Sequence, residues 1–370
     1  MIEIASLKRR ANAFARTALA PVPLNFWQSA FPKDVVALCY HVVSDEDLPH
    51  LQLYPYKNSE QFEADVRFAR DRAATYRQVA DRRLSGKSLA QNSILFTFDD
   101  GLTQCYDVAR PILKKLGVDA VFFVTTDYLG DRESFFESTQ SLCAAAIATI
   151  DGARAREILA ALDSDATKTA TDRANLELAS GRLAATRLPV ADDPAIRDLY
   201  LLAFGITDGD GRLAHLCEFL DVDVATYATQ TPIFMSREQV AGLAADGFTI
   251  GAHGRKHRSL EHLALEQLEE EIVSSCEEVR AITGQSRVPF AFPYSGLGIE
   301  RAVLAGILQR NPVVELIFDS GCLRNDPQFI VNRIFADAPA IVTTNAQPIS
   351  NVPTALRDAW SVPSAWFRSR

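Results

Sequence analysis

The chain has 370 residues, of which 48% are hydrophobic and 23% charged, and its formal net charge is -9. This composition indicates a globular protein with a sizeable core, and the length allows one large α/β domain with an insertion, or two domains. The acidic balance, without a basic stripe interleaved with aromatics, argues against a nucleic-acid-binding protein.

Features of the whole chain favour a cytoplasmic location. Its six cysteines are scattered without a C-x-x-C pair, a pattern typical of buried, reduced thiols: Cys39, Cys105, Cys143, Cys217, Cys276 and Cys322. No run of about 18 apolar residues predicts a spanning helix, and no apolar stretch with a cleavage site follows the basic N-terminus. Residues 6–19 are predicted either as a surface-packed helix or as a basic helix on the inner face of a membrane.

Strands and helices alternate from residue 35 onward. In chain order we expect a strand at 35–40, a polar loop at 44–58, a helix at 59–72, a strand at 94–98, a helix at 106–116 and a strand at 119–124. Gly117 suits the position that closes the second helix. This alternation is typical of a parallel sheet covered by helices.

The stretch from residue 132 to 232 has a different pattern. It is rich in Ala, Leu, Asp and Arg and lacks β-branched strand runs, so we expect an all-helical insertion of about 100 residues. Four roles stay open for it: a lid over a substrate cleft, a dimerisation surface, a docking site for a partner enzyme, or simple self-packing.

The alternation resumes at Ser236, where Ser236 and Gln239 have the spacing of a capping box that opens a helix ending near Gly247. Further predicted elements are a strand at 248–252, a helix at 265–283 and strands at 289–293, 313–318 and 329–335.

Two adjacent carboxylates stand at the end of one predicted strand. Thr97-Phe98-Asp99-Asp100-Gly101 follows the apolar run 94–96. Charged side chains at that position are costly unless something there uses the charge. Along an extended strand the two would point in opposite directions, so that one could meet a metal while its neighbour faces an attacking water.

Two histidines follow another predicted strand. His253 and His257 are four residues apart, a spacing that predicts two imidazoles on one face of a helical turn. Alone, this spacing is a weak signal. Together with Asp99-Asp100 it indicates a three-ligand divalent-metal site, with the remaining carboxylate available as a base. Imidazole and carboxylate donors suit Zn²⁺, and Co²⁺, Ni²⁺ or Mn²⁺ fit similar ligands.

These residues resemble a known family. Thr97–Gly101, the His253/His257 pair and Pro289–Gly296 are similar to the first three motifs of the NodB-type polysaccharide deacetylases, carbohydrate esterase family 4, over roughly residues 35–130 and 233–336. The resemblance implies a deformed (β/α) barrel, a bound divalent metal and hydrolysis of N-acetyl groups on amino sugars. It also implies that Asp99 is the catalytic base and that Asp100, His253 and His257 bind the metal.

The sequence departs from the usual family pattern at two places. Ala291 stands in the region where an Arg normally pairs with the base, and no histidine follows His262 to serve as the usual general acid. Both departures resemble the exopolysaccharide-deacetylase branch, in which the motif order is circularly permuted and the acid His lies on the first strand. That resemblance makes His41 the candidate general acid; the ordinary alternative is a capping histidine at the end of a strand.

Two further residues are assigned to the site. Tyr294 and the backbone after Pro293 would line it, and in the family a backbone N–H in this motif helps to hold the oxyanion. Arg333 could orient Asp99 in place of the missing Arg. The ordinary alternatives are aromatic packing for Tyr294 and an exposed strand arginine for Arg333.

The sequence therefore predicts four segments: a basic helical segment at 1–30, a barrel made of 31–131 and 233–345, the helical insertion at 132–232, and a C-terminal tail at 346–370. The expected activity is metal-dependent N-deacetylation of a surface polysaccharide or of its lipid-linked precursor. The alternatives are a deacylase of another amide or ester, such as a deformylase or an O-acetyl esterase, and a non-catalytic carbohydrate-binding protein.

Overall fold

The computed structural model describes residues 35–89, 93–130, 136–164, 188, 192–206, 211–320, 324, 326–338 and 352. The chain divides into two compact units. The first contains residues 1–43, 56–129 and 235–370, and the second contains 44–55 and 130–234. The predicted N-terminal helical segment (1–30) lies outside the described residues, as does the tail (346–370) apart from Val352.

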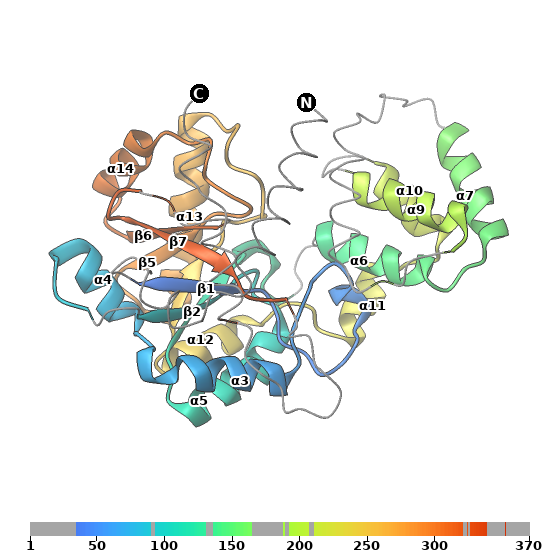
Figure 1. Ribbon diagram of the computed structural model, residues 1–370. Coiled ribbons are helices and arrows are strands. Elements are labelled where there is room, and N and C mark those ends of the chain that lie inside the picture. The colour runs from blue at the N-terminus through green and yellow to red at the C-terminus, as the bar shows by residue number, and fades with distance from the viewer. Residues whose placement is uncertain are drawn as a thin grey trace, which may run out of the picture. The chain divides into compact units, whose positions relative to one another are not determined.

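Seven parallel strands form a closed barrel in the first unit, each pairing with the next in chain order and β7 returning to β1 (Figure 1). The strands are β1 (Val36–Tyr40), β2 (Ile94–Phe98), β3 (Ala120–Val124), β4 (Thr249–Ala252), β5 (Val288–Ala291), β6 (Val314–Asp319) and β7 (Ile330–Phe335). The predicted (β/α) barrel and its strands are confirmed.

The barrel strands are largely apolar on both faces, as is typical of a parallel sheet covered by helices, although β6 and β7 also carry buried charged residues. β1, β2 and β3 are buried at every residue. Aromatic rings pack on both faces of the strands: Phe98 stacks on Phe122 with ring centroids 4.9 Å apart, and Phe123, on the opposite face of β3 from Phe122, lies 5.0 Å from Phe318. This packing makes the barrel a rigid support for the side chains at its ends.

Helices of the first unit follow the strands in sequence: α3 (Ser59–Ala69), α4 (Tyr76–Ser85), α5 (Arg110–Leu116), α12 (Arg237–Ala245), α13 (Leu265–Thr283) and α14 (Arg301–Arg310). The capping box at Ser236 is present, and Gly117 ends α5 with a φ of 66°. The helix expected at 106–116 begins instead as a π-helical turn, Cys105–Ala109. The sequence patterns did not predict α4 or α14.

The second unit has its own apolar core. Its regular elements, among the residues that the structure describes, are helical: η1 (Pro49–Leu51), α6 (Phe136–Ile147), α7 (Gly152–Ser164), α9 (Pro194–Gly205), α10 (Arg212–Phe219) and α11 (Val224–Gln230). The segment 44–55, which the sequence patterns place in the barrel, packs here instead. The His50 Nδ1 and Tyr227 hydroxyl atoms are 2.9 Å apart, and the Leu53 N–H donates to Ser141 Oγ at 3.2 Å.

The described cysteines are free thiols, and Cys322 lies outside the described residues. Among the helices that the structure describes, none combines the length and apolarity needed to span a membrane.

Candidate active site

The predicted site residues lie along one rim of the barrel. Because all seven strands are parallel, their carboxyl ends meet at the same edge, where barrel enzymes hold their catalytic groups. The residues and their positions are His41 after β1, Asp99 and Asp100 after β2, His253 and His257 after β4, Tyr294 after β5, and Arg333 within β7.

Arg333, on β7, binds the carboxylate of Asp99, which follows β2. Its Nη1 donates to Asp99 Oδ1 at 2.5 Å and its Nη2 to Oδ2 at 2.7 Å, and Nη2 also donates to Ser320 Oγ at 2.9 Å. Burial by itself raises the pKa of the Asp99 carboxyl. Arg333 and then His253 more than offset that effect, so the pKa of Asp99 lies below its usual range. The carboxylate is thus held ionised in a buried setting.

Asp100 and the two histidines form a compact group of possible metal ligands. His253 Nε2 lies 3.4 Å and His257 Nε2 3.2 Å from Asp100 Oδ1. One ligand atom from each of the three residues lies within 4.8 Å of the other two. Although burial acts to raise the pKa of Asp100, His257 and His253 hold it well below its usual range.

The donor set fits a divalent metal ion. His253 Nδ1 lies 2.9 Å from the Ala291 carbonyl oxygen, a contact that needs the proton on Nδ1 and leaves Nε2 available toward Asp100. A backbone carbonyl on the second ring nitrogen is the usual support of a metal-binding histidine. Two imidazole nitrogens and one carboxylate oxygen, mostly buried, are a common ligand set for a metal with open positions.

The two histidines do not converge in the predicted way. We expected a helical turn, but residues 253–257 form a bent loop in which Gly254 has a φ of 73° and His257 a φ of 51°. These left-handed residues reverse the chain tightly enough to bring both rings together, with centroids 5.0 Å apart. The Glu271 carboxylate accepts the Arg255 N–H at 2.7 Å, which holds the loop against α13.

The Asp99 and Asp100 side chains point in different directions, as expected, but the cause is not the one predicted. β2 ends at Phe98, so the two carboxylates do not alternate along a strand. Asp100 instead has a φ of 71° and Gly101 a φ of 84°. The left-handed turn aims Asp99 at Arg333 and Asp100 at the histidines. Gly101 leaves room for it, since a Cβ there would lie 3.3 Å from Val124.

His41 is held by an acidic residue that the sequence analysis did not single out. The Asp337 carboxylate accepts the His41 backbone N–H at 2.8 Å, and its other oxygen lies 2.8 Å from His41 Nδ1. Burial lowers the pKa of His41, but Asp337 outweighs it and raises that pKa to about 9. The imidazole is therefore held as a cation near neutral pH.

Two aromatic rings stand next to the site histidines. Tyr294 has a φ of 60° and is 48% exposed, and its ring centroid lies 5.0 Å from that of His257. Phe335, the last residue of β7, is 52% exposed and stacks on His41 at 5.9 Å with an interplanar angle of 21°.

Sequence reasoning missed three residues of the site: Asp337, Cys39 and Ser320. Cys39 Sγ donates to Asp99 Oδ2 at 3.3 Å. Asp337 had a usable signal, because it is an acidic residue just beyond a buried strand, the same pattern that identified Asp99. Ser320 also follows a strand, but a serine there carries no distinctive signal. Cys39 lies within an apolar strand, and its local sequence does not distinguish it from a core residue.

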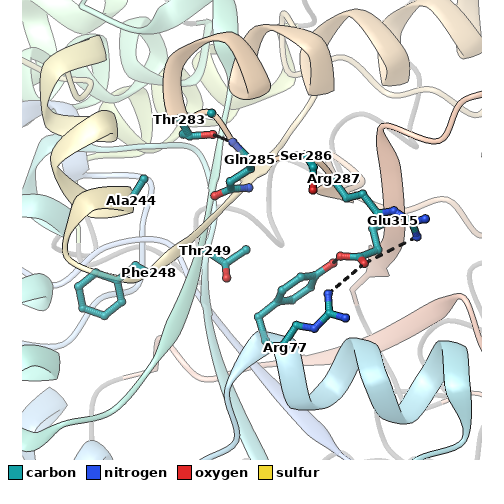
Figure 2. Close-up of a pocket in the computed structure, with 11 residues that line it drawn as sticks. Arg77, Ala244, Phe248, Thr249, Thr283, Gln285, Ser286, Arg287 and Glu315 are labelled. Atoms are coloured by element: carbon teal, nitrogen blue, oxygen red, sulfur yellow. Dashed lines mark hydrogen bonds and ion pairs between the residues drawn. The ribbon is translucent and has the colours of Figure 1, made fainter.

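A separate pocket of about 690 Å³ lies at the amino ends of β4, β5 and β6 (Figure 2). Its polar centre is the buried Glu315, which accepts the Tyr76 hydroxyl at 2.8 Å and pairs with Arg77 and Arg287 at 3.8 and 4.0 Å. None of the candidate catalytic or metal-binding residues lines it. Its charges are paired within the protein, so we assign the chemistry to the opposite rim.

Comparison with known proteins agrees with this geometry. The polysaccharide deacetylase family model matches residues 86–149 and 207–306. The polysaccharide deacetylase homologue YxkH of Bacillus subtilis (strain 168) is 27% identical over 109 residues, which cover 29% of this chain and 37% of that protein's length.

Two solved structures match this chain. The Streptococcus pyogenes deacetylase PplD, in complex with acetate, matches with a TM-score of 0.50 and 13% identity over 89% of this chain and 99% of that chain. IcaB from Ammonifex degensii matches with a TM-score of 0.46 and 16% identity over 88% of this chain and 98% of that chain. The family match coincides with the motifs that supply Asp99, Asp100, His253, His257 and Tyr294, and the PplD likeness extends to the barrel. The family match and the barrel fold support the interpretation of this chain as a NodB-type polysaccharide deacetylase.

Proposed function

We propose that this protein is a metal-dependent hydrolase that removes N-acetyl groups from the amino sugars of a surface polysaccharide or of its lipid-linked precursor. One observation carries the proposal: a single rim of the barrel holds a carboxylate paired with a buried arginine, an imidazole paired with a carboxylate, and a group of three metal-type ligands. Amide hydrolysis needs a base, an acid and a stabiliser of negative charge, and this rim offers a candidate for each.

Asp100, His253 and His257 would hold the metal. Zn²⁺ is the expected ion, and Co²⁺, Ni²⁺ or Mn²⁺ suit the same donors. When bound, such an ion supplies Lewis-acid polarisation of a carbonyl oxygen and lowers the pKa of a water molecule toward about 7.

Asp99 is the proposed general base. Its carboxylate accepts the proton of the water that attacks the acetamide carbonyl carbon. The bidentate contact with Arg333 fixes the direction of the carboxylate and keeps it ionised before the proton arrives. A positioned base of this kind contributes about 10²–10⁴-fold to the rate.

His41 is the proposed general acid. When the carbon–nitrogen bond breaks, the nitrogen needs a proton, because an amine anion is a very poor leaving group. Asp337 keeps His41 charged and fixes its ring through two contacts, so that the protonated imidazole can deliver that proton. The products are acetate and a free amino sugar.

Acetate release from N-acetylglucosamine oligomers, measured together with metal content on one purified sample, tests the proposal. Chelator-sensitive release that Zn²⁺ or Co²⁺ restores would support it, and Asp99→Asn serves as the inactive control. Bound metal without acetate release from any oligomer or lipid-linked N-acetyl sugar would overturn the substrate assignment. A sample with neither metal nor acetate release would favour a carbohydrate-binding protein.

A further inference from the structure

Exposed aromatic surface gathers at the proposed site. The large apolar side chains exposed in the described part of the chain are Leu84, Leu265, Tyr294, Leu297 and Phe335. Two of them, Tyr294 and Phe335, are aromatic and lie directly against site histidines. Apolar rings left in water forgo hydrophobic stabilisation, and grouped at a polar site they indicate a surface that a ligand covers.

Phe335 is rigidly placed. Its backbone lies at the end of β7, in register with Cys39 of β1, and the next N–H, that of Ala336, donates to the Cys39 carbonyl at 2.8 Å. The same strand carries Arg333, and Asp337 follows two residues later. A ring fixed by strand pairing loses little conformational entropy when a ligand covers it.

Tyr294 lies on an anchored loop. Two residues after it, the Gly296 N–H donates to the buried Asp319 carboxylate at 3.1 Å, which anchors the loop after β5. Tyr294 therefore stands beside the proposed metal ligand His257, whereas Phe335 stands beside the proposed acid His41.

We propose that Phe335 is a substrate-binding residue that stacks on the pyranose ring carrying the leaving amine, with Tyr294 lining the side where the acetyl group is held. This inference rests on the proposed function. The assignment of sides follows from the chemistry: the acid must reach the nitrogen, and the nitrogen is bonded to the sugar. A ring beside the acid therefore lies beside the sugar.

The chemistry of the side chain narrows the ligand class. Phe335 has no polar atom and offers a flat apolar face, which matches the C–H face of a pyranose rather than its hydroxyl edge. A substrate without a sugar ring would gain nothing from this contact. Phe335 thus selects glycans over small N-acetyl amides. Its contact with the sugar affects KM and Kd rather than kcat.

The test compares Phe335→Ala with Phe335→Tyr and with the control Leu84→Ala, which removes a side chain of similar exposure from α4. With an N-acetylglucosamine tetramer, Phe335→Ala should raise KM by about 3- to 10-fold, the range of one aromatic contact. Phe335→Tyr should restore KM, and Leu84→Ala should leave it unchanged.

Calorimetric binding of the same tetramer to Asp99→Asn, with and without Phe335→Ala, separates binding from catalysis. The double variant should bind the tetramer more weakly by the same factor. If Phe335 serves only to hold His41, kcat and the alkaline limb of the pH profile change while KM and Kd do not, and the inference is overturned.

The two proposals can fail separately. Acetate release with an unaffected KM and Kd would overturn the role of Phe335 and leave the deacetylase proposal standing. Binding that depends on Phe335, without acetate release from any N-acetyl glycan, would support the role of Phe335 and overturn the deacetylase proposal. Asp99→Asn leaves the buried Arg333 without its partner, so circular dichroism first establishes that the variant is folded. If a folded Asp99→Asn does not bind the tetramer at all, the role of Phe335 in glycan binding is wrong.

Discussion

Arg333 binds both carboxylate oxygens of Asp99, at 2.5 and 2.7 Å, although 234 residues separate them in sequence. Arg333 is fully buried and Asp99 is 3% exposed. Neither charge could stand alone in that setting, because an unpaired buried ion is strongly destabilising. The pair therefore has two consequences: it fixes the proposed base, and it ties β7 to the end of β2.

Replacing Arg333 with Met should destabilise the protein by about 3–5 kcal/mol, because the Asp99 charge would be left buried without its partner. Urea denaturation followed by circular dichroism measures the loss. Asp99→Asn added to Arg333→Met should recover part of it. Arg310→Met is the matched control: Arg310 also makes a bidentate pair, with Glu269, but at the surface, where little stability depends on it. Equal losses in the two single variants would contradict the interpretation.

Two variants of the site should differ in their effect on metal content: one should lose only turnover, and the other should lose both turnover and metal. Asp99→Asn should lower turnover by about 10²-fold or more while the metal content stays unchanged, because the base is not among the three proposed ligands. His253→Ala should lose both, since it removes a ligand. Elemental analysis of dialysed protein and acetate release provide the two readings. An Asp99→Asn variant that stays fully active would show that the base is assigned wrongly.

Activity should fall on the alkaline side as the pH rises through about 9. His41 has to be protonated to act as an acid, and Asp337 raises its pKa to about 9, so the active form is present below that pH and lost above it. Asp337→Asn removes the carboxylate that raises this pKa, and burial then acts to lower it. The alkaline limb should therefore move down by roughly 1–3 pH units. A profile of kcat/KM against pH, with the surface variant Asp81→Asn as control, measures the shift. An alkaline limb that stays in place would exclude His41 as the acid.

Gly254→Ala should weaken metal binding without removing a ligand. Gly254 has a φ of 73°, and a Cβ there would lie 3.2 Å from Glu271 Oε1, the atom that holds the loop between the two histidines. We expect a 10- to 100-fold loss of affinity, typical of disturbing the support of a ligand.

Gly284→Ala is the control for Gly254→Ala. Gly284 has the same φ of 73° at the end of α13, with no heavy atom within 4 Å of a Cβ. Both variants should lose about 1–2 kcal/mol of stability from backbone strain, but only Gly254→Ala should lose metal. Competition titration with a chromophoric chelator measures the affinity. Equal metal affinity in the two variants would mean that the loop does not position the histidines.

The sequence by itself determined the strands, most of the helices and the chemistry available at their ends. Runs such as Ala120–Val124 and the capping box at Ser236 act through neighbouring residues, and both are present as expected. The residue types and spacing at Asp99-Asp100 and His253/His257, each following a predicted strand, together with the resemblance of these motifs to the deacetylase family, predicted that they share one site.

Only the tertiary structure decided how these groups are oriented and what holds them. The pairing of His41 with Asp337 spans 296 residues, and that of Asp99 with Arg333 depends on β7 returning to β1. The left-handed backbone at Asp100 and His257 replaced the strand and the helical turn that local spacing suggested. Periodicity reports which face of an element is buried, whereas these contacts arise from the closure and register of the barrel, which no local pattern encodes.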